Sequence, residues 1–164
     1  MIKLIVLDVD GCLSDGKITY TGSGDEIKSF NVKDGLAIKS WQKLGFDVAI
    51  ITGRKSSIVA RRAKELGVDL LFQGVKNKLN MLNIILKDKS YDLKNVAAIG
   101  DDLNDIIMLK QVAISFTPND GALDIIKIAD IVLKKNGGDG VVREMIEYLI
   151  DKQNLRKEFL ALWE

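Results

Sequence analysis

Ile5-Val6-Leu7-Asp8-Val9-Asp10-Gly11 is an apolar run that ends in two aspartates and a glycine. An uninterrupted apolar run near the start of a chain is typical of a parallel strand that is covered on both faces. Ligand sites in such sheets lie at the carboxyl ends of the strands, which is where Asp8 and Asp10 stand. Side chains two apart on extended backbone point the same way, so the two carboxylates can flank one small site.

Further apolar runs follow the first, separated by longer segments of helical periodicity. The predicted strands are residues 3–9, 46–51, 70–72, 96–99, 112–115 and 131–133. This alternation is typical of βαβ units that build a parallel sheet. The sequence therefore predicts an α/β fold with a doubly wound, mostly parallel sheet and helices on both faces.

Two of the connecting helices are indicated by apolar stripes and end signals. The first covers about residues 35–44 with Gly45 as its C-terminal cap, and the second begins at Ser56 or Ser57 and ends at Gly67. The stripes are Ala37, Trp41 and Leu44 in the first helix and Val59, Ala63 and Leu66 in the second.

Two segments depart from the alternation. Residues 17–32 form two short extended runs around Thr21-Gly22-Ser23-Gly24-Asp25, which predicts a β-hairpin inserted after the first strand. Residues 152–164 carry an apolar stripe, for which we expect core or interface packing rather than a membrane anchor. The stripe consists of Leu155, Phe159 and Leu162. Since no composition shift marks a linker, residues 1–164 are expected to form a single domain.

Composition excludes several classes of function. The 24 Lys and Arg residues nearly balance the 23 Asp and Glu residues, so the net charge of +1 provides no broad field for nucleic acid or an anionic membrane. No apolar run is long enough to span a bilayer, and no signal-peptide pattern is expected at the start. The single cysteine, Cys12, fits a reducing compartment, so we predict a cytoplasmic protein. The absence of histidine leaves carboxylates, lysines and hydroxyls to carry any chemistry.

Polar residues also follow other predicted strands. Thr52 comes after the second strand, Asp101 and Asp102 after the fourth, and Lys78 lies in the connection after the third. Because the carboxyl ends of parallel strands share one edge of the sheet, these side chains are expected to converge there.

The converging residues predict a magnesium and phosphate site. Neighbouring carboxylates repel each other unless a cation lies between them, and Mg²⁺ prefers oxygen ligands, which matches Asp8 with Asp101. Lys78 would neutralise phosphate oxygens, and the Thr52 hydroxyl with backbone amides around Gly53 would bind them as well.

Four segments, in order along the chain, resemble the motifs of the haloacid dehalogenase superfamily. They are Asp8-Val9-Asp10-Gly11-Cys12-Leu13, Thr52-Gly53, Gly74-Val75-Lys76-Asn77-Lys78-Leu79 and Gly100-Asp101-Asp102-Leu103-Asn104-Asp105. The resemblance covers most of the chain and implies a Rossmann-like fold and an aspartyl-phosphate mechanism. It implies that Asp8 is the nucleophile, Asp10 the general acid and then base, and Lys78 the phosphate clamp, with Thr52 among the catalytic groups.

The same resemblance implies a set of magnesium ligands. They would be the Asp8 carboxylate, the Asp10 main-chain carbonyl and Asp101, with Asp102 and Asp105 in support. Asp102, Asn104 and Asp105 could also begin the next helix, a role that suits acidic residues and asparagine.

Within the superfamily, three features resemble the 3-deoxy-D-manno-octulosonate 8-phosphate phosphatases. They are the short hairpin in place of a cap domain, Thr52-Gly53-Arg54 and Gly138-Asp139-Gly140-Val141-Val142-Arg143-Glu144. This likeness implies a sugar-acid phosphate substrate used in lipopolysaccharide precursor synthesis. It also implies a homotetramer in which the hairpins assemble and a neighbouring subunit closes the site.

A sugar-acid phosphate carries a carboxylate, which calls for a second cation beyond Lys78. Arg54 is the best placed candidate for substrate binding, with Arg62 behind it. A related nonulosonate phosphate is an alternative substrate, and a phospho-accepting receiver module is an alternative from another class. A cysteine-phosphatase mechanism would need an arginine where Ile18 stands, so Cys12 is interpreted as a small loop residue.

Overall fold

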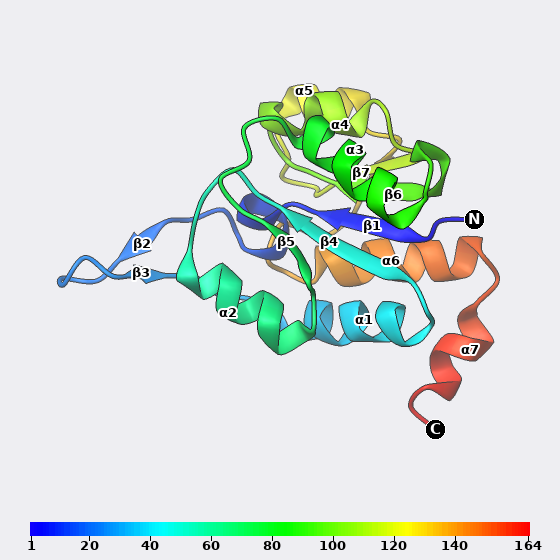
Figure 1. Ribbon diagram of the computed structural model, residues 1–164. Coiled ribbons are helices and arrows are strands. Elements are labelled where there is room, and N and C mark those ends of the chain that lie inside the picture. Colours follow the sequence, from blue (N-terminus) through cyan, green and yellow to red (C-terminus); the bar gives the residue numbers. More distant parts are fainter.

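The computed structural model describes residues 1–164 and contains a parallel six-stranded sheet of order β5-β4-β1-β6-β7-β8 (Figure 1). The strands are β1 (Leu4–Leu7), β4 (Asp47–Ile51), β5 (Leu70–Phe72), β6 (Val96–Ile99), β7 (Ile114–Thr117) and β8 (Ile131–Val132). The predicted α/β fold with a doubly wound parallel sheet is therefore confirmed. The central strand β1 pairs with both β4 and β6, so the chain crosses over on either side of it.

Helices cover both faces of the sheet (Figure 1). The four on one side are α1 (Val32–Lys43), α2 (Ser57–Leu66), α6 (Val141–Lys152) and α7 (Arg156–Ala161), and the three on the other are α3 (Lys78–Lys89), α4 (Ile106–Leu109) and α5 (Leu123–Ile128). Successive residues of β1 enter the two cores in alternation. Ile5 and Leu7 pack under the first group, whereas Leu4 and Val6 pack under the second. Burial on both faces explains why this strand is continuously apolar.

Several predicted boundaries were wrong. The first strand ends at Leu7 rather than Val9, because Val9 already belongs to the irregular helical turn η1 (Val9–Leu13). The fifth strand begins at Ile114 rather than Val112 and runs to Thr117, because the chain is still turning after α4 at Val112 and Ala113. Helix α1 begins three residues earlier than expected, since the Asn31 side chain accepts a hydrogen bond from the Lys33 N–H and caps it.

The predicted glycine caps agree with the structure, whereas the predicted serine cap agrees in position only. Gly67 caps α2 with φ of 69°, and Gly45 follows the last residues of α1 with φ of 88°, conformations that favour glycine. Ser56 occupies the N-cap position of α2, but its side chain makes no capping bond. Its hydroxyl instead donates to Glu26 in the hairpin, 2.8 Å away.

The predicted hairpin forms, although its paired strands are short. β2 (Thr19–Tyr20) and β3 (Glu26–Ile27) pair antiparallel and extend away from the sheet (Figure 1). Around β3 the exposure alternates, with Glu26 and Lys28 half-buried and Ile27 exposed. The hairpin thus directs Glu26 and Lys28 toward the protein and Ile27 toward solvent.

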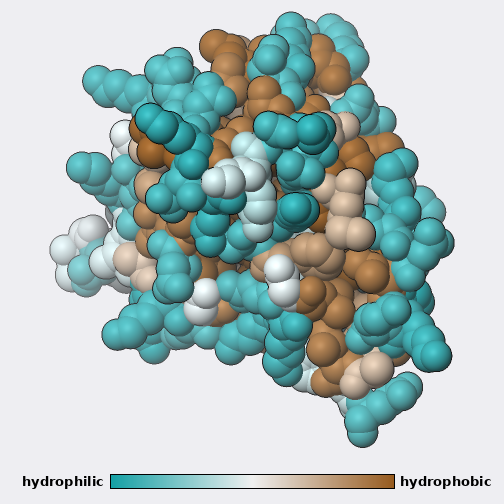
Figure 2. Space-filling view, turned by 45° about the vertical axis from the view of Figure 1, so that its right-hand side comes forward, coloured by the Kyte–Doolittle hydropathy of each residue, from teal (hydrophilic) through white to brown (hydrophobic).

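The C-terminal segment packs on its own subunit. Phe159 is buried in the core beneath α1 and α6, and Leu155 packs against the same core. Leu162 is half-buried and Trp163 is exposed. On the face shown in Figure 2, hydrophilic residues surround the exposed apolar ones. No helix combines the length and apolar character needed to cross a bilayer.

α1 and α6 meet at a buried carboxylate. Asp34 has 1% of its surface exposed, its Oδ1 accepts the Arg143 N–H at 2.7 Å, and its Oδ2 has no hydrogen-bond partner. Burial raises the pKa of Asp34 from 3.8 to about 6, even though the Arg143 N–H and the charges of Lys135 and Arg62 lower it.

This pKa predicts a pH-dependent stability. The folded protein binds the Asp34 proton more tightly than the unfolded chain, so the free energy of unfolding falls as pH rises through about 4 to 6, by roughly 3 kcal/mol. Asp34→Asn keeps an acceptor for the Arg143 N–H and should flatten that dependence. Urea unfolding of both proteins between pH 4 and 7 measures the difference, and parallel stability curves would contradict the prediction.

Candidate functional site

The carboxyl edge of the sheet holds a cavity of about 250 Å³ that no apolar residue lines. Its walls are Asp8, Asp10, Gly16, Thr52, Gly53, Arg54, Asp101, Asp102 and Asn104. The structure therefore brings together residues that follow β1, β4 and β6, as the sequence predicts. A polar cavity of this size suits a small, highly charged ligand.

Asp8 and Asp101 face each other across the cavity. A carboxylate oxygen of each residue and the Cys12 Sγ all lie within 4.8 Å of one another. Burial and the charge of Asp105 raise the pKa of Asp8 to about 7, although Lys78 lowers it, and burial with the charges of Asp8 and Asp105 raises the pKa of Asp101 to about 8. This electrostatic cost is what a bound divalent cation would remove, so the donor set fits a hard metal ion such as Mg²⁺.

Gly11 allows this close approach. Its φ is 94°, and a Cβ at this position would lie 2.0 Å from Asp101 Oδ2. A side chain here would therefore displace the Asp101 carboxylate, which explains why glycine follows the two aspartates.

Lys78, the first residue of α3, is buried between two carboxylates. Its Nζ lies 2.5 Å from Asp8 Oδ1 and 2.6 Å from Asp105 Oδ1. Although burial lowers it, the charges of Asp8 and Asp105 raise the pKa of Lys78 above its usual value. Lys78 is thus held as a cation beside Asp8, where a phosphoryl group bound in the cavity would meet it.

Asp105 links this lysine to the loop that carries Asp101. Its Oδ2 accepts the backbone N–H groups of Asp101 and Asp102 at 3.2 and 3.4 Å. Asp102 caps the short turn η3 (Leu103–Asp105) by accepting the Leu103 N–H. The two residues therefore take part in the start of a helical turn, and Asp105 in addition joins Lys78 to the loop of Asp101.

Thr52 and Gly53 form another part of the cavity wall. Thr52 is buried at the end of β4, and its main chain bonds to Phe72 and Val75 on the neighbouring segment. The Thr52 hydroxyl belongs to the cavity lining and is available to an oxygen-rich ligand. Asn104 also lines the cavity; from sequence it was interpreted only as a helix-starting residue.

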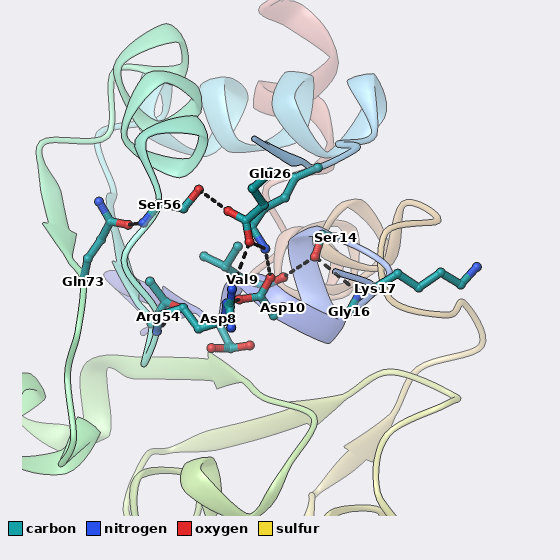
Figure 3. Close-up of polar contacts among 12 residues, drawn as sticks. Asp8, Val9, Asp10, Ser14, Gly16, Lys17, Glu26, Arg54, Ser56 and Gln73 are labelled. Carbon is teal, nitrogen blue, oxygen red and sulfur yellow. Dashed lines mark hydrogen bonds and ion pairs between the residues drawn. The ribbon is translucent and has the colours of Figure 1, made fainter. Parts of the chain in front are cut away.

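The hairpin adds two residues that the motifs do not contain (Figure 3). Glu26 accepts a hydrogen bond from Arg54 at 3.0 Å and from the Ser56 hydroxyl at 2.8 Å. These contacts, the Ser56 bond foremost, hold the pKa of Glu26 below its usual value. Lys28 donates to Asp10 Oδ1, and the Arg54 Nε lies 3.9 Å from Asp10 Oδ2. The spacing of Glu26 and Lys28 around an exposed Ile27 is the sequence signal that could have indicated them.

The two predicted substrate-binding arginines lie in different places. Arg54 lines the cavity, with 44% of its side chain exposed. Arg62 lies outside it, where its guanidinium donates to the Asn31 carbonyl and lies 5.6 Å from the centre of the Phe30 ring. The structure therefore joins Arg54, but not Arg62, to the other predicted site residues.

Cys12 has its thiol in the core. The residue is fully buried among the apolar side chains of α1 and α6, and burial, with the nearby carboxylates, raises the pKa of its thiol. A protonated, inaccessible thiol agrees with its interpretation as a small loop residue.

Comparison with known proteins identifies relatives of the whole chain. Residues 70–145 match the model of the haloacid dehalogenase-like hydrolases. The 3-deoxy-D-manno-octulosonate 8-phosphate phosphatase KdsC of Escherichia coli K12 is 42% identical over 149 residues, which cover 91% of this chain and 79% of that protein.

Solved structures agree with this relationship. The phosphatase of the same name from Moraxella catarrhalis, solved in complex with magnesium ion, phosphate ion and KDO, has a TM-score of 0.95 and 40% identity, over 99% of this chain and 94% of that one. The cobalt-bound phosphatase from Haemophilus influenzae has a TM-score of 0.89 and 36% identity, over 93% and 90% of the two chains. The chain therefore belongs to the haloacid dehalogenase-like hydrolases, in the branch that includes the 3-deoxy-D-manno-octulosonate 8-phosphate phosphatases.

Proposed function

We propose that this protein is a magnesium-dependent phosphatase that hydrolyses 3-deoxy-D-manno-octulosonate 8-phosphate through an aspartyl-phosphate on Asp8. The observation that carries the proposal is the convergence of Asp8 and Asp101 at one polar cavity, with the ammonium group of Lys78 bonded to Asp8. The named activity of relatives that cover nearly the whole chain supports the substrate. A cytoplasmic location fits a cytosolic sugar phosphate and an unpaired cysteine.

The reaction follows from the positions of two carboxylates. An Asp8 oxygen attacks phosphorus while the bond from phosphorus to the ester oxygen breaks, and Asp10 gives that oxygen its proton, which leaves the sugar alcohol. Asp10 then takes a proton from water as the water oxygen attacks phosphorus. Phosphate departs and both carboxylates return to their starting states. Lys78 and the Thr52 hydroxyl bind the phosphoryl oxygens throughout.

Asp8, Asp101 and the Asp10 main-chain carbonyl would hold the magnesium ion. The ion would neutralise the paired carboxylates and the phosphoryl oxygens, so that an anionic nucleophile can approach an anionic substrate. The Asp105 bonds to the loop of Asp101 keep that ligand in place.

Asp8→Asn should lower phosphate release by roughly 10³-fold or more, because the amide is a poor nucleophile, while the fold is retained. The measurement is phosphate release with magnesium, together with mass spectrometry of the acid-quenched wild type for a phosphoryl group on Asp8. Asp15→Asn is a matched control, since Asp15 is exposed and pairs only with Lys17. Retained turnover in Asp8→Asn would exclude the covalent route.

Arg54 is proposed to bind the carboxylate of the sugar acid. Its Nε lies 3.9 Å from Asp10 Oδ2, and it is the only basic residue among those that line the cavity. Arg62 lies outside the cavity, so any contact from it would have to be made with a part of the substrate that extends beyond the walls.

A panel of phosphate esters tests this substrate class. The specificity constant for 3-deoxy-D-manno-octulosonate 8-phosphate should exceed those for neuraminate-type, glycolate and hexose phosphates by about tenfold or more. Arg54→Gln should lower it by about 10-fold to 100-fold for carboxylated sugars and by less than about threefold for hexose phosphates. Arg61→Gln is the control, because Arg61 is 82% exposed. Similar low values across the panel would remove the sugar-acid assignment.

The receiver-module alternative has little support. A receiver module assigns no common role to Asp101, Lys78 and the Asp10 carboxylate. The relatives that match most of the chain are hydrolases.

We also propose a homotetramer built through the hairpins. The hairpin exposes Ile18, Tyr20 and Ile27, by 44%, 62% and 49%. Apolar side chains gathered on a projecting two-stranded element favour contact with another copy of the chain. A neighbouring subunit so placed could close the open mouth of the cavity in place of a cap domain.

Light scattering at assay concentration should give the mass of a tetramer. Ile27→Lys should shift the mass toward smaller species and lower the activity, because a charge would be buried between hairpins. Ile84→Lys on α3 is the control, since Ile84 is 61% exposed on a different element. A monomeric wild type would defeat the proposal.

A further inference from the structure

Lys28 is a buried cation next to the site that the four motifs do not explain. Its side chain has 0% of its surface exposed, and its Nζ donates to Asp10 Oδ1. The same Nζ lies 3.4 Å from Glu26 Oε1. Lysine is rarely buried unless it is paired, so these two carboxylates account for its position.

The hairpin geometry fixes this arrangement. Glu26 and Lys28 are two apart on extended backbone, so both point to the inner face while Ile27 points outward. Glu26 is itself held by Arg54 and by the Ser56 hydroxyl at the start of α2 (Figure 3). The ammonium group of Lys28 therefore lies between Asp10 and Glu26, and Glu26 is itself fixed by Arg54 and Ser56.

Lys28 does not line the cavity, whereas Asp10 and Arg54 do. A ligand in the cavity would meet Asp10 and Arg54 first, and Lys28 lies behind Asp10. This placement argues against direct binding of the substrate by Lys28. It leaves the orientation of the Asp10 carboxylate as the property that Lys28 can control.

We propose that Lys28 is a positioning residue that holds Asp10 by Oδ1, so that Oδ2 is presented to the ester oxygen of the bound phosphate. The inference rests on the proposed role of Asp10 as proton donor. Of the two oxygens, Oδ1 is occupied by the lysine, and the nearest cation to Oδ2 is Arg54 at 3.9 Å, beyond hydrogen-bond distance. Oδ2 is therefore the oxygen free to carry the proton that the leaving group receives.

Leaving groups of different basicity separate this role from others. An alkyl alkoxide needs the proton of Asp10 as the bond to phosphorus breaks, whereas 4-nitrophenolate departs without one. The value of kcat/KM reports only the steps up to formation of the aspartyl-phosphate, so the later hydrolysis does not enter. Esters without a carboxylate, such as glucose 6-phosphate, also avoid any contact with the carboxylate of a sugar acid.

Lys28→Met should lower kcat/KM for glucose 6-phosphate by about 10-fold to 100-fold and for 4-nitrophenyl phosphate by less than about threefold. Their ratio within one preparation does not depend on the fraction of folded enzyme. Lys94→Met, which removes an exposed lysine paired with Asp92, should leave the ratio unchanged. Equal losses on both esters would show a merely structural role and overturn the proposal.

Asp10→Asn separates the two levels of inference. The signature of a lost proton donor is a much larger fall in kcat/KM for glucose 6-phosphate than for 4-nitrophenyl phosphate. If Asp10→Asn shows this signature and Lys28→Met does not, the proposal for Lys28 fails alone. If Asp10→Asn lacks the signature, the assignment of Asp10 as proton donor fails, and that for Lys28 with it. Should Lys28→Met prove insoluble, Glu26→Gln weakens the same anchor and should shift the ratio in the same direction; an unchanged ratio there would also overturn the proposal.

Discussion

Three carboxylates gathered beside one lysine form the constraint on which the site depends. Asp8 and Asp105 are buried and Asp101 is half-buried, the charge of Asp105 raises the pKa of Asp8, the charges of both raise that of Asp101, and Lys78, bonded to Asp8 and Asp105, supplies a single compensating charge. Removing several like charges from water is costly unless cations accompany them. The site is therefore stable only with a proton or a further cation present. A divalent metal ion meets that requirement, and its remaining positive charge favours an anionic ligand.

The parallel sheet makes this unfavourable concentration of charge possible. β1 and β6 are neighbours in register, so the residues that follow Leu7 and Ile99 emerge side by side. The strands themselves are buried in two cores and hold the loops at a fixed separation. Gly11 supplies the remaining space, since no side chain could stand between the two loops.

The sequence indicates this part of the molecule because its rules are local. Apolar runs predict the strands, and each polar residue at the end of a run must lie at one edge. The start of β7 was misplaced because Val112 and Ala113 are as apolar as the strand that they precede, and only the turn after α4 separates them. The position of Arg62 depends on how α2 packs against the segment before α1, which no local pattern encodes.

The contacts of Glu26 and Lys28 in the hairpin could not be predicted from the sequence. Its two-residue strands give a weak periodic signal, and a lysine in a surface turn is ordinarily solvated. The alternation from Glu26 to Lys28 acquires meaning only when the inner face meets Asp10 and Arg54. The outer face then follows by the same alternation, because Ile27 must point away from the cavity. One short element thus links the two proposals made for it. The Lys28 contact that orients Asp10 and the exposed Ile27 side chain offered to a second subunit lie on opposite faces of the same strand, so that assembly could stabilise the geometry of the acid.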